Sequence, residues 1–191
     1  MTTEDNTKRE LNEIVEALSG SSRRERQTAA KSLHDIAKTS PKDLVPYRNE
    51  IIDALSRPEA QTRWECLNVL CELVPLDPAA CEEAIADAEA SLFDEDNGLV
   101  RFAGMRFLCA LGATSKARSK MVWGYINEGI QCYHGNLEFS DMLNAVTEFS
   151  KGDLDSDVKN ELVARMKFDA ENAKGALGRR AQQIIDNASK G

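Results

Sequence analysis

An apolar pattern that returns every 37 to 38 residues is the feature that most constrains how this chain can fold. The segment "ALSGSSRRERQTAAKSLHDIA" (17–37) aligns with "ALSRPEAQTRWECLNVLCELV" (54–74), and both align with "SLFDEDNGLVRFAGMRFLCALG" (91–112). The alignment superposes Arg26, Arg63 and Arg101, and also Leu33, Leu70 and Leu108. A unit repeated at this period predicts a stack of similar elements rather than a single compact bundle.

Two further copies follow with weaker patterns. The segment "GIQCYHGNLEFSDMLNAVTEFS" (129–150) keeps the apolar positions, although Phe139 replaces the arginine, and a polar copy ends in "RRAQQIIDNA" (179–188). A polar last repeat is expected, because the end of an array meets water. We therefore predict one domain over 10–191, preceded by a disordered tail over 1–9. Its repeats would span 10–40, 41–77, 78–115, 116–152 and 153–190.

Each unit has the pattern of two helices. In the first unit, the expected first helix has apolar residues at the i, i+3, i+4, i+7 spacing of one buried face. These residues are Leu11, Ile14, Val15 and Leu18, and those of its partner helix are Ala29, Ala30, Leu33, Ile36 and Ala37. Turn signals such as "SGSS", "SRPEA" and "DEDNG" separate the two helices. A single helix pair cannot bury its apolar stripe, so stacking of the pairs is needed.

The segment "NGLVRFAGMRFLCALG" (97–112) resembles the second helix of a HEAT repeat, which has a Val-Arg pair, then small and apolar residues, then leucine. The resemblance extends over about residues 10–188. It implies an all-α, right-handed α-solenoid of about five two-helix HEAT-like repeats, in the armadillo-like class, whose second helices line a concave surface. HEAT proteins mostly serve as binding scaffolds. The resemblance therefore implies a non-enzymatic scaffold or adaptor that binds a partner protein or peptide.

The recurring arginines, Arg26, Arg63 and Arg101, are expected to be structural. In HEAT-like stacks this residue ties the turn between the helices to its neighbours by hydrogen bonds. A planar guanidinium suits that role, because helix ends leave carbonyl groups without partners.

The residues that follow the arginines are the candidates for binding. Three rows, which begin at Gln27, Lys31 and His34 and recur in each unit, lie away from the apolar set on a helix of 3.6 residues per turn. We expect them to form the concave floor, with the Trp64 and Phe102 rings side by side. Exposed aromatic residues beside an arginine are typical interface anchors. The predicted partner-binding residues are Lys31, Trp64, Asn68, Phe102 and Arg106. The alternative is that both rings fold over neighbouring turns or are covered by an adjacent helix.

The five cysteines lie inside apolar helical patterns, which indicates reduced thiols in a cytoplasmic protein. Cys71 and Cys109 share the third row, but neighbouring helices lie about 8–10 Å apart, too far for a disulfide. His34 lies in the same row, but a row with one ligand on each helix cannot bring its ligands within coordination distance of one metal ion. The aspartates of "GDLDSDVKNEL" (152–162) begin like a calcium loop, which fails at Val158 and Ala164, so they predict a helix start. No cofactor or metal is expected.

Composition argues against several function classes. The net charge of −8 argues against a surface that collects phosphates. The chain has two histidines, no glycine-rich loop and no Ser-His-Asp order that the repeats could bring together, so we expect no enzymatic activity. HEAT-like alkylpurine DNA glycosylases are the alternative, since Trp64 and Trp123 could line a DNA-binding groove. The start "MTTEDNTKRE" has no signal-peptide pattern, and no apolar run reaches the length of a membrane span.

Acidic residues concentrate in residues 82–96, which contain seven acids and no lysine or arginine. Two interpretations stay open: a solvated outer face, or a docking patch for a basic partner. A monomer or a weak homodimer is expected, since the concave face could also be filled by a second copy of the chain.

Overall fold

The computed structural model describes residues 3–190, and these contain helices but no strands. The first helix pair is α1 (Thr3–Ser19) and α2 (Arg23–Ala37). The other elements, with 3₁₀ helices labelled η, are η1 (Pro41–Tyr47), α3 (Arg48–Asp53), η2 (Ala54–Ser56), α4 (Ala60–Leu73), α5 (Pro78–Cys81), η3 (Glu82–Ala84), α6 (Ile85–Leu92), α7 (Gly98–Gly112), α8 (Lys116–Cys132), α9 (Phe139–Phe149), α10 (Ser156–Asn172) and α11 (Gly175–Ala188).

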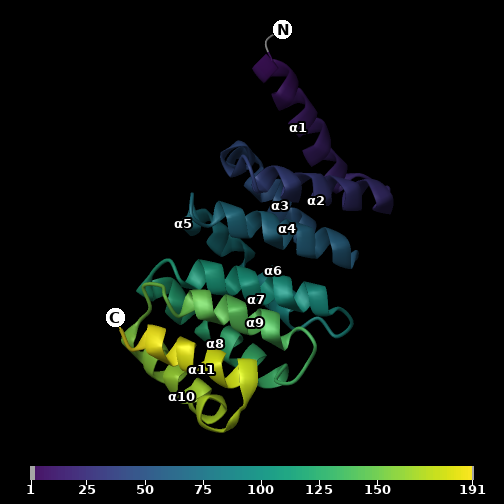
Figure 1. The fold of residues 1–191 in the computed structure, drawn as a ribbon. Helices are drawn as coiled ribbons and strands as arrows, with labels where there is room; N and C mark the ends of the chain where they lie inside the picture. Colours follow the sequence, from purple (N-terminus) through teal and green to yellow (C-terminus); the bar gives the residue numbers. More distant parts are fainter. Residues whose placement is uncertain (1–2, 191) are drawn as a thin grey trace.

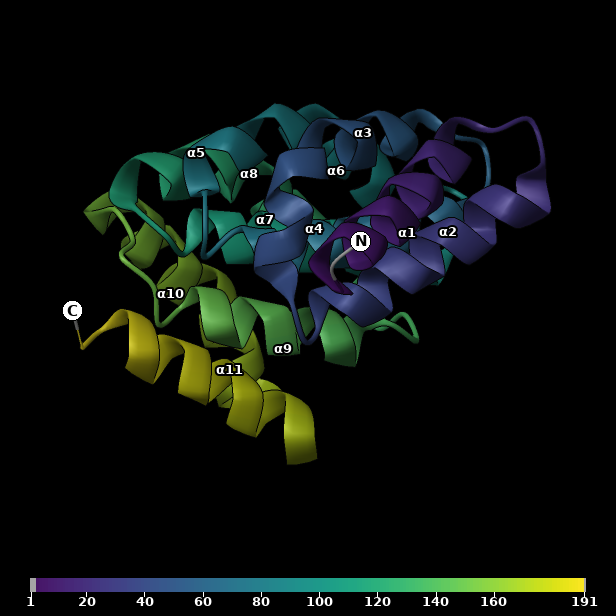
Figure 2. The same ribbon diagram turned by 90° about the horizontal axis from the view of Figure 1, so that it is seen from above.

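The helices form a stack. Each second helix packs against the next second helix, in the order α2, α4, α7, α9 and α11, and also against the first helix of its own pair. Figure 1 shows this order, with α1 and α11 at opposite ends. Seen from above, α3, α6 and α8 lie along one side, and α9 and α11 lie toward the other (Figure 2). The predicted all-α solenoid is confirmed.

The stack is held by a continuous apolar core. The equivalent leucines Leu33, Leu70 and Leu108 are all fully buried, each at 0% exposure, as the repeat alignment requires. Burial of one such side chain contributes about 1.5–3 kcal/mol. The core therefore runs along the stack and couples each helix pair to the next. No helix in residues 3–190 has the length and apolar character of a membrane span.

The first helices of the second and third pairs are interrupted, unlike the continuous helices that the pattern predicts. The second pair begins with 3₁₀ helix η1, which has Pro41 in its first turn and Pro46 inside it. Proline has no N–H group to donate, so a regular α-helix cannot continue through Pro46. In the third pair, Asp77 caps the short helix α5 by accepting a hydrogen bond from the Ala80 N–H at 3.1 Å.

A disordered tail was expected over 1–9, and the structure describes residues 3–9 as the beginning of α1. Residues 1 and 2 lie outside the described part of the chain. Lys8, Arg9 and Glu10 are good helix formers, and they extend the helix outward from the buried Leu11. An ion pair between Arg9 and Glu13 at 3.2 Å, one turn apart, supports this end of the helix.

Candidate functional site

The three recurring arginines join successive helix pairs. Arg26, on α2, binds both carboxylate oxygens of Glu59 and donates to the Gly20 carbonyl at 2.7 Å. Glu59 is the residue directly before α4. Arg26 thus connects the turn of its own pair with the turn of the next pair.

The other two arginines make the same kind of connection. Arg63 donates to Asp94 at 2.7 Å, in the turn between α6 and α7. Arg101 donates to Glu138 at 2.6 Å, directly before α9, and to the Asp94 carbonyl at 2.9 Å. Its guanidinium also lies 5.2 Å from the centre of the Tyr133 ring. All three guanidinium groups therefore bind to turns between helices.

These contacts change the acidity of two carboxyl groups. The hydrogen bond from Arg26 is the main cause that holds the pKa of Glu59 below its ordinary value. At Asp94, burial alone would raise the pKa, but hydrogen bonds from Arg63 and from the Asp96 and Asn97 N–H groups outweigh it and lower the pKa. Both carboxylates are therefore favoured in the charged form in the folded state.

Acid should consequently weaken the connections between helix pairs. Because the folded-state pKa of Glu59 is depressed, its stabilising contribution is complete above the ordinary glutamate pKa of about 4.5 and is lost as pH falls below it. We expect the free energy of unfolding to fall more between pH 5 and pH 3 for the wild type than for Glu59→Gln, measured by urea unfolding. Equal losses in both proteins would contradict this role of Glu59.

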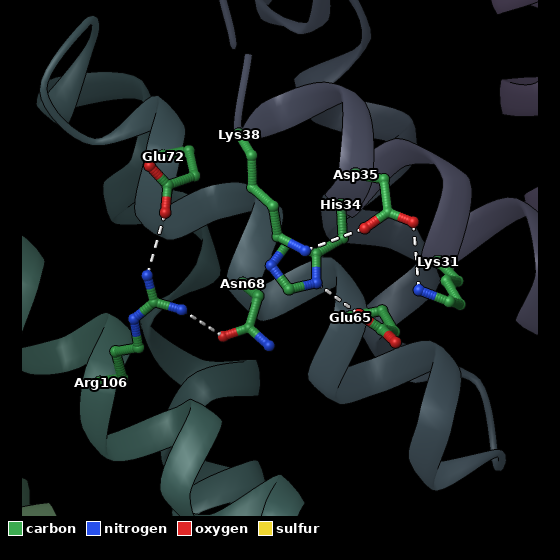
Figure 3. A network of polar contacts seen from close by, with 8 residues as sticks. All are labelled: Lys31, His34, Asp35, Lys38, Glu65, Asn68, Glu72 and Arg106. Carbon is green, nitrogen blue, oxygen red and sulfur yellow. Dashed lines mark hydrogen bonds and ion pairs between the residues drawn. The ribbon is translucent and has the colours of Figure 1, made fainter. Parts of the chain in front are cut away.

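The candidate binding surface is the exposed side of α2, α4, α7 and α9, named here the second-helix face. Trp64 and Phe102 are half-buried and pack against the core, and Lys31 is exposed. Arg106 donates to the Asn68 amide oxygen at 2.8 Å and to Glu72 at 3.0 Å (Figure 3). The structure therefore joins two of the predicted binding residues, Asn68 and Arg106, in one polar network.

This network continues onto α2. His34 Nδ1 lies 2.5 Å from a Glu65 oxygen, and Asp35 accepts hydrogen bonds from Lys31 at 3.1 Å and from Lys38 at 2.9 Å (Figure 3). The hydrogen bonds from Lys38 and Lys31 lower the pKa of Asp35 to about 2. The three cations of the network, two lysines and Arg106, are matched by three carboxylates. The network therefore has no net charge when His34 is neutral.

A groove of about 270 Å³ lies farther along the face, between α7 and α9, and is named here the α7–α9 groove. Its residues are Phe102, Arg106, Cys109, Ala110, Asp141, Asn144, Ala145 and Glu148. The two acids lie seven residues apart on the exposed side of α9, and the apolar residues line the groove between the helices. It combines an apolar lining with an acidic rim.

The row of residues that begins at His34 was expected on the concave floor, and this is wrong for three of its residues. Cys71, Cys109 and Thr147 are buried, at 8%, 2% and 6% exposure. These side chains are short, and Arg106 and Glu72 lie close enough to the Cys71 thiol to affect its acidity. Burial raises the pKa of Cys71 to about 12 and also raises the pKa of Cys109, so neither thiol forms a reactive thiolate near neutral pH.

Other sequence motifs have structural surroundings. Asp155 caps α10 by accepting a hydrogen bond from the Asp157 N–H at 3.0 Å, which confirms the predicted helix start. In the acidic segment, Glu82 pairs with Arg118 at 2.7 Å, and Asp94 pairs with Arg63 as described above. Within residues 3–190, no group of three or more histidine, cysteine or acidic side chains is arranged to hold a metal ion.

The carboxylates that bind the arginines were missed by the sequence analysis. Glu59, Asp94 and Glu138 lie 33, 31 and 37 residues after their arginines, so their spacing is less regular than the repeat. A signal was nevertheless present, since each acid lies in the turn shortly before a second helix. A search for an acid in each turn would have found all three.

Comparison with known proteins identifies the fold but no relative by sequence. No family model matches the chain, and neither does any curated protein. Among solved structures, an engineered protein matches with a TM-score of 0.76 and 14% identity, over 95% of this chain and 48% of the other. This chain thus spans about half the length of that protein. A designed armadillo repeat protein in complex with the peptide (KR)4 matches with a TM-score of 0.76 and 11% identity, over 92% and 80% of the two chains.

The chain has an armadillo-like fold. A further match, to computationally designed armadillo repeat proteins for modular peptide recognition, has a TM-score of 0.73 and 11% identity, over 91% of this chain and 80% of the other. At such low identity the similarity concerns the backbone arrangement alone. The side chains of this armadillo-like solenoid must therefore carry any argument about what it binds.

Proposed function

We propose that this protein is a non-enzymatic scaffold or adaptor that binds an extended segment of a partner protein on the second-helix face. The observation that carries the proposal is a set of polar groups on the second-helix face without partners in the described part of the chain, at Trp64 and Asn68 on α4 and at Asn144 on α9. Within residues 3–190, the Trp64 indole N–H and the Asn144 amide make no hydrogen bond, and Asn68 uses only its amide oxygen. Free amide and indole groups beside aromatic surface suit a peptide backbone, which offers one donor and one acceptor per residue.

The polar network supports this proposal, because it fixes the side chains before a partner arrives. Asn68 and Arg106 hold one another, and Arg106 is also held by Glu72. A surface whose side chains are already ordered loses less entropy on binding. The designed armadillo proteins of similar fold include one described for modular peptide recognition, and we extend that mode of binding to this chain as part of the proposal.

Charge favours a polypeptide partner over a nucleic acid. The network on α2, α4 and α7 has equal numbers of cations and carboxylates, and the α7–α9 groove adds acidic groups. Phosphate binding depends on a surplus of lysine and arginine. We therefore expect no salt-dependent shift of duplex DNA in a gel assay with micromolar protein, and a shift that weakens with added salt would favour the DNA-binding alternative.

The absence of an enzymatic activity is also part of the proposal. Within the described residues, each histidine pairs with a carboxylate, His34 with Glu65 and His134 with Asp169, and neither ring shares a hydrogen bond with a hydroxyl or thiol group. Nucleophilic catalysis requires a nucleophile within hydrogen-bond reach of its base. The thiols of Cys71 and Cys109 are buried and protonated. These features suit binding better than chemistry.

A peptide-display experiment tests the proposed surface. A library of random 12-residue peptides would be selected against the protein, and enriched peptides would be measured with Trp64→Ala combined with Arg106→Ala. We expect at least a tenfold loss of affinity, about 1.4 kcal/mol, because the aromatic surface and the ordered amide are lost together.

A matched control is available on the opposite side of the solenoid. Arg165 on α10 donates to Asn127 on α8 at 2.7 Å, as Arg106 on α7 does to Asn68 on α4, and Phe168 on α10 is 71% exposed. Replacing Phe168 and Arg165 by alanine should leave binding unchanged. Full binding by the Trp64/Arg106 variant, with helicity intact by circular dichroism, would contradict the proposed surface.

A further inference from the structure

We propose that the α7–α9 groove binds one lysine or arginine side chain of the partner, and that the partner segment is not polybasic. This inference rests on the proposed function and adds the chemical identity of the segment. It depends on two features of the second-helix face: the shape and charge of the α7–α9 groove, and the partners that the carboxylates of the polar network already have.

The lining of the groove suits a long aliphatic side chain. Phe102 and Ala110 on α7 and Ala145 on α9 provide apolar surface, and Cys109 lies beneath them. The methylene groups of lysine and arginine pack on such surface while their charged ends stay in water. The volume of about 270 Å³ is large enough for one such side chain.

The rim of the groove favours a positive charge at the end of that side chain. Asp141 and Glu148 are exposed and line the groove. Within residues 3–190, the Asp141 carboxylate makes no hydrogen bond or ion pair, and Glu148 pairs only with Lys151, at 2.6 Å in an exposed contact. Exposed ion pairs contribute at most about 1 kcal/mol, so a bound cation can replace Lys151.

Arg106 also lines the groove, but its charge is used elsewhere. Its guanidinium donates to Asn68 and to Glu72, both on the neighbouring helix α4. Glu72 therefore balances the charge of Arg106. Of the two acids of α9 at the groove, Asp141 has no partner within residues 3–190 and Glu148 has only the exposed Lys151. A carboxylate of the partner would be repelled by both acids.

The carboxylates of the polar network on α2 and α4 already have partners. Asp35 already binds Lys31 and Lys38, Glu65 pairs with His34, and Glu72 binds Arg106. A second cation placed over α2 would meet two exposed lysines and no free carboxylate of this network. A run of lysines and arginines therefore gains little from its additional charges, and neutral or acidic residues are favoured over α2.

The test uses the peptides enriched by display. We expect the enriched sequences to share one lysine or arginine position and to have neutral or acidic residues on one side of it. Replacing that residue by methionine, which has similar length and no charge, should weaken binding to the wild type about tenfold. The same replacement should have little effect on binding to Asp141→Asn combined with Glu148→Gln.

The control and the contrary outcomes separate this inference from the proposed function. Asp157→Asn also removes an acid from the first turn of a helix, α10, and should bind like the wild type. If the double variant loses helicity, Glu148→Gln alone replaces it in the same comparison, because Glu148 lies outside the first turn of α9.

Absence of any enriched peptide would contradict the proposed function itself. Peptides that need Trp64 and Arg106 but share no single cation, or that are polybasic, would overturn this inference alone.

Discussion

Gly104→Ala is expected to lower the free energy of unfolding by about 2–3 kcal/mol, although alanine is the better helix former. Gly104 lies inside α7, where α6 packs closely against it. A methyl group there would lie 2.7 Å from the Leu92 nitrogen and 2.8 Å from the Ala88 carbonyl oxygen. Both atoms belong to the backbone of α6, so the two helices would have to separate. Urea unfolding followed by circular dichroism measures the effect.

The same substitution at Gly124 is the matched control. Gly124 lies in the middle of α8, and a methyl group there would meet no atom within 4 Å. Gly124→Ala should therefore raise the free energy of unfolding by about 0.5–1 kcal/mol, the difference in helix propensity. Effects of equal sign at the two glycines would contradict the close packing of α6 against α7.

Arg101→Ala is expected to lower the free energy of unfolding by about 3 kcal/mol, because it leaves a largely buried carboxylate without its partner. The side chains of Arg101 and Glu138 are only 15% and 12% exposed. The variant also loses the hydrogen bond to the Asp94 carbonyl and the contact with the Tyr133 ring. The comparison is again made by urea unfolding.

A double-mutant cycle identifies how much of that loss belongs to the ion pair. Glu138→Gln should cost less in the Arg101→Ala background than in the wild type, by at least about 1 kcal/mol, because the charge it removes is already uncompensated there. Arg9→Ala is the control, since its pair with Glu13 is exposed and contributes at most about 0.5 kcal/mol. Strictly additive effects of the Arg101 and Glu138 substitutions would show that the pair does not couple the two helix pairs.

The period of the sequence was sufficient to predict the stack and the equivalence of its positions. Leu33, Leu70 and Leu108 are buried alike, because residues at the same place in successive repeats meet the same neighbours. Arg26 and Arg101, also related by this period, make the same type of contact with a turn. Arrangements that depend on the repeat itself could therefore be predicted without coordinates.

Features that depend on individual side chains could not be predicted in this way. Cys71 and Cys109 lie on the same side of their helices as exposed residues. Their side chains are short, so larger neighbouring side chains cover them. Trp64 and Phe102 were expected side by side, but each packs against the core, and no ring contact joins them among the described residues. Periodicity predicts the direction in which a side chain points, but it does not predict whether larger neighbouring side chains cover it.

Binding of an extended peptide to the second-helix face can be observed by amide NMR of the 21.1 kDa protein during titration with a peptide enriched by display. We expect the shifted signals to belong to α4, α7 and α9, with Trp64, Asn68, Phe102 and Asn144 among them. Shifts confined to the first helices α6, α8 and α10 would contradict it, because the peptide would then lie on the opposite side of the solenoid.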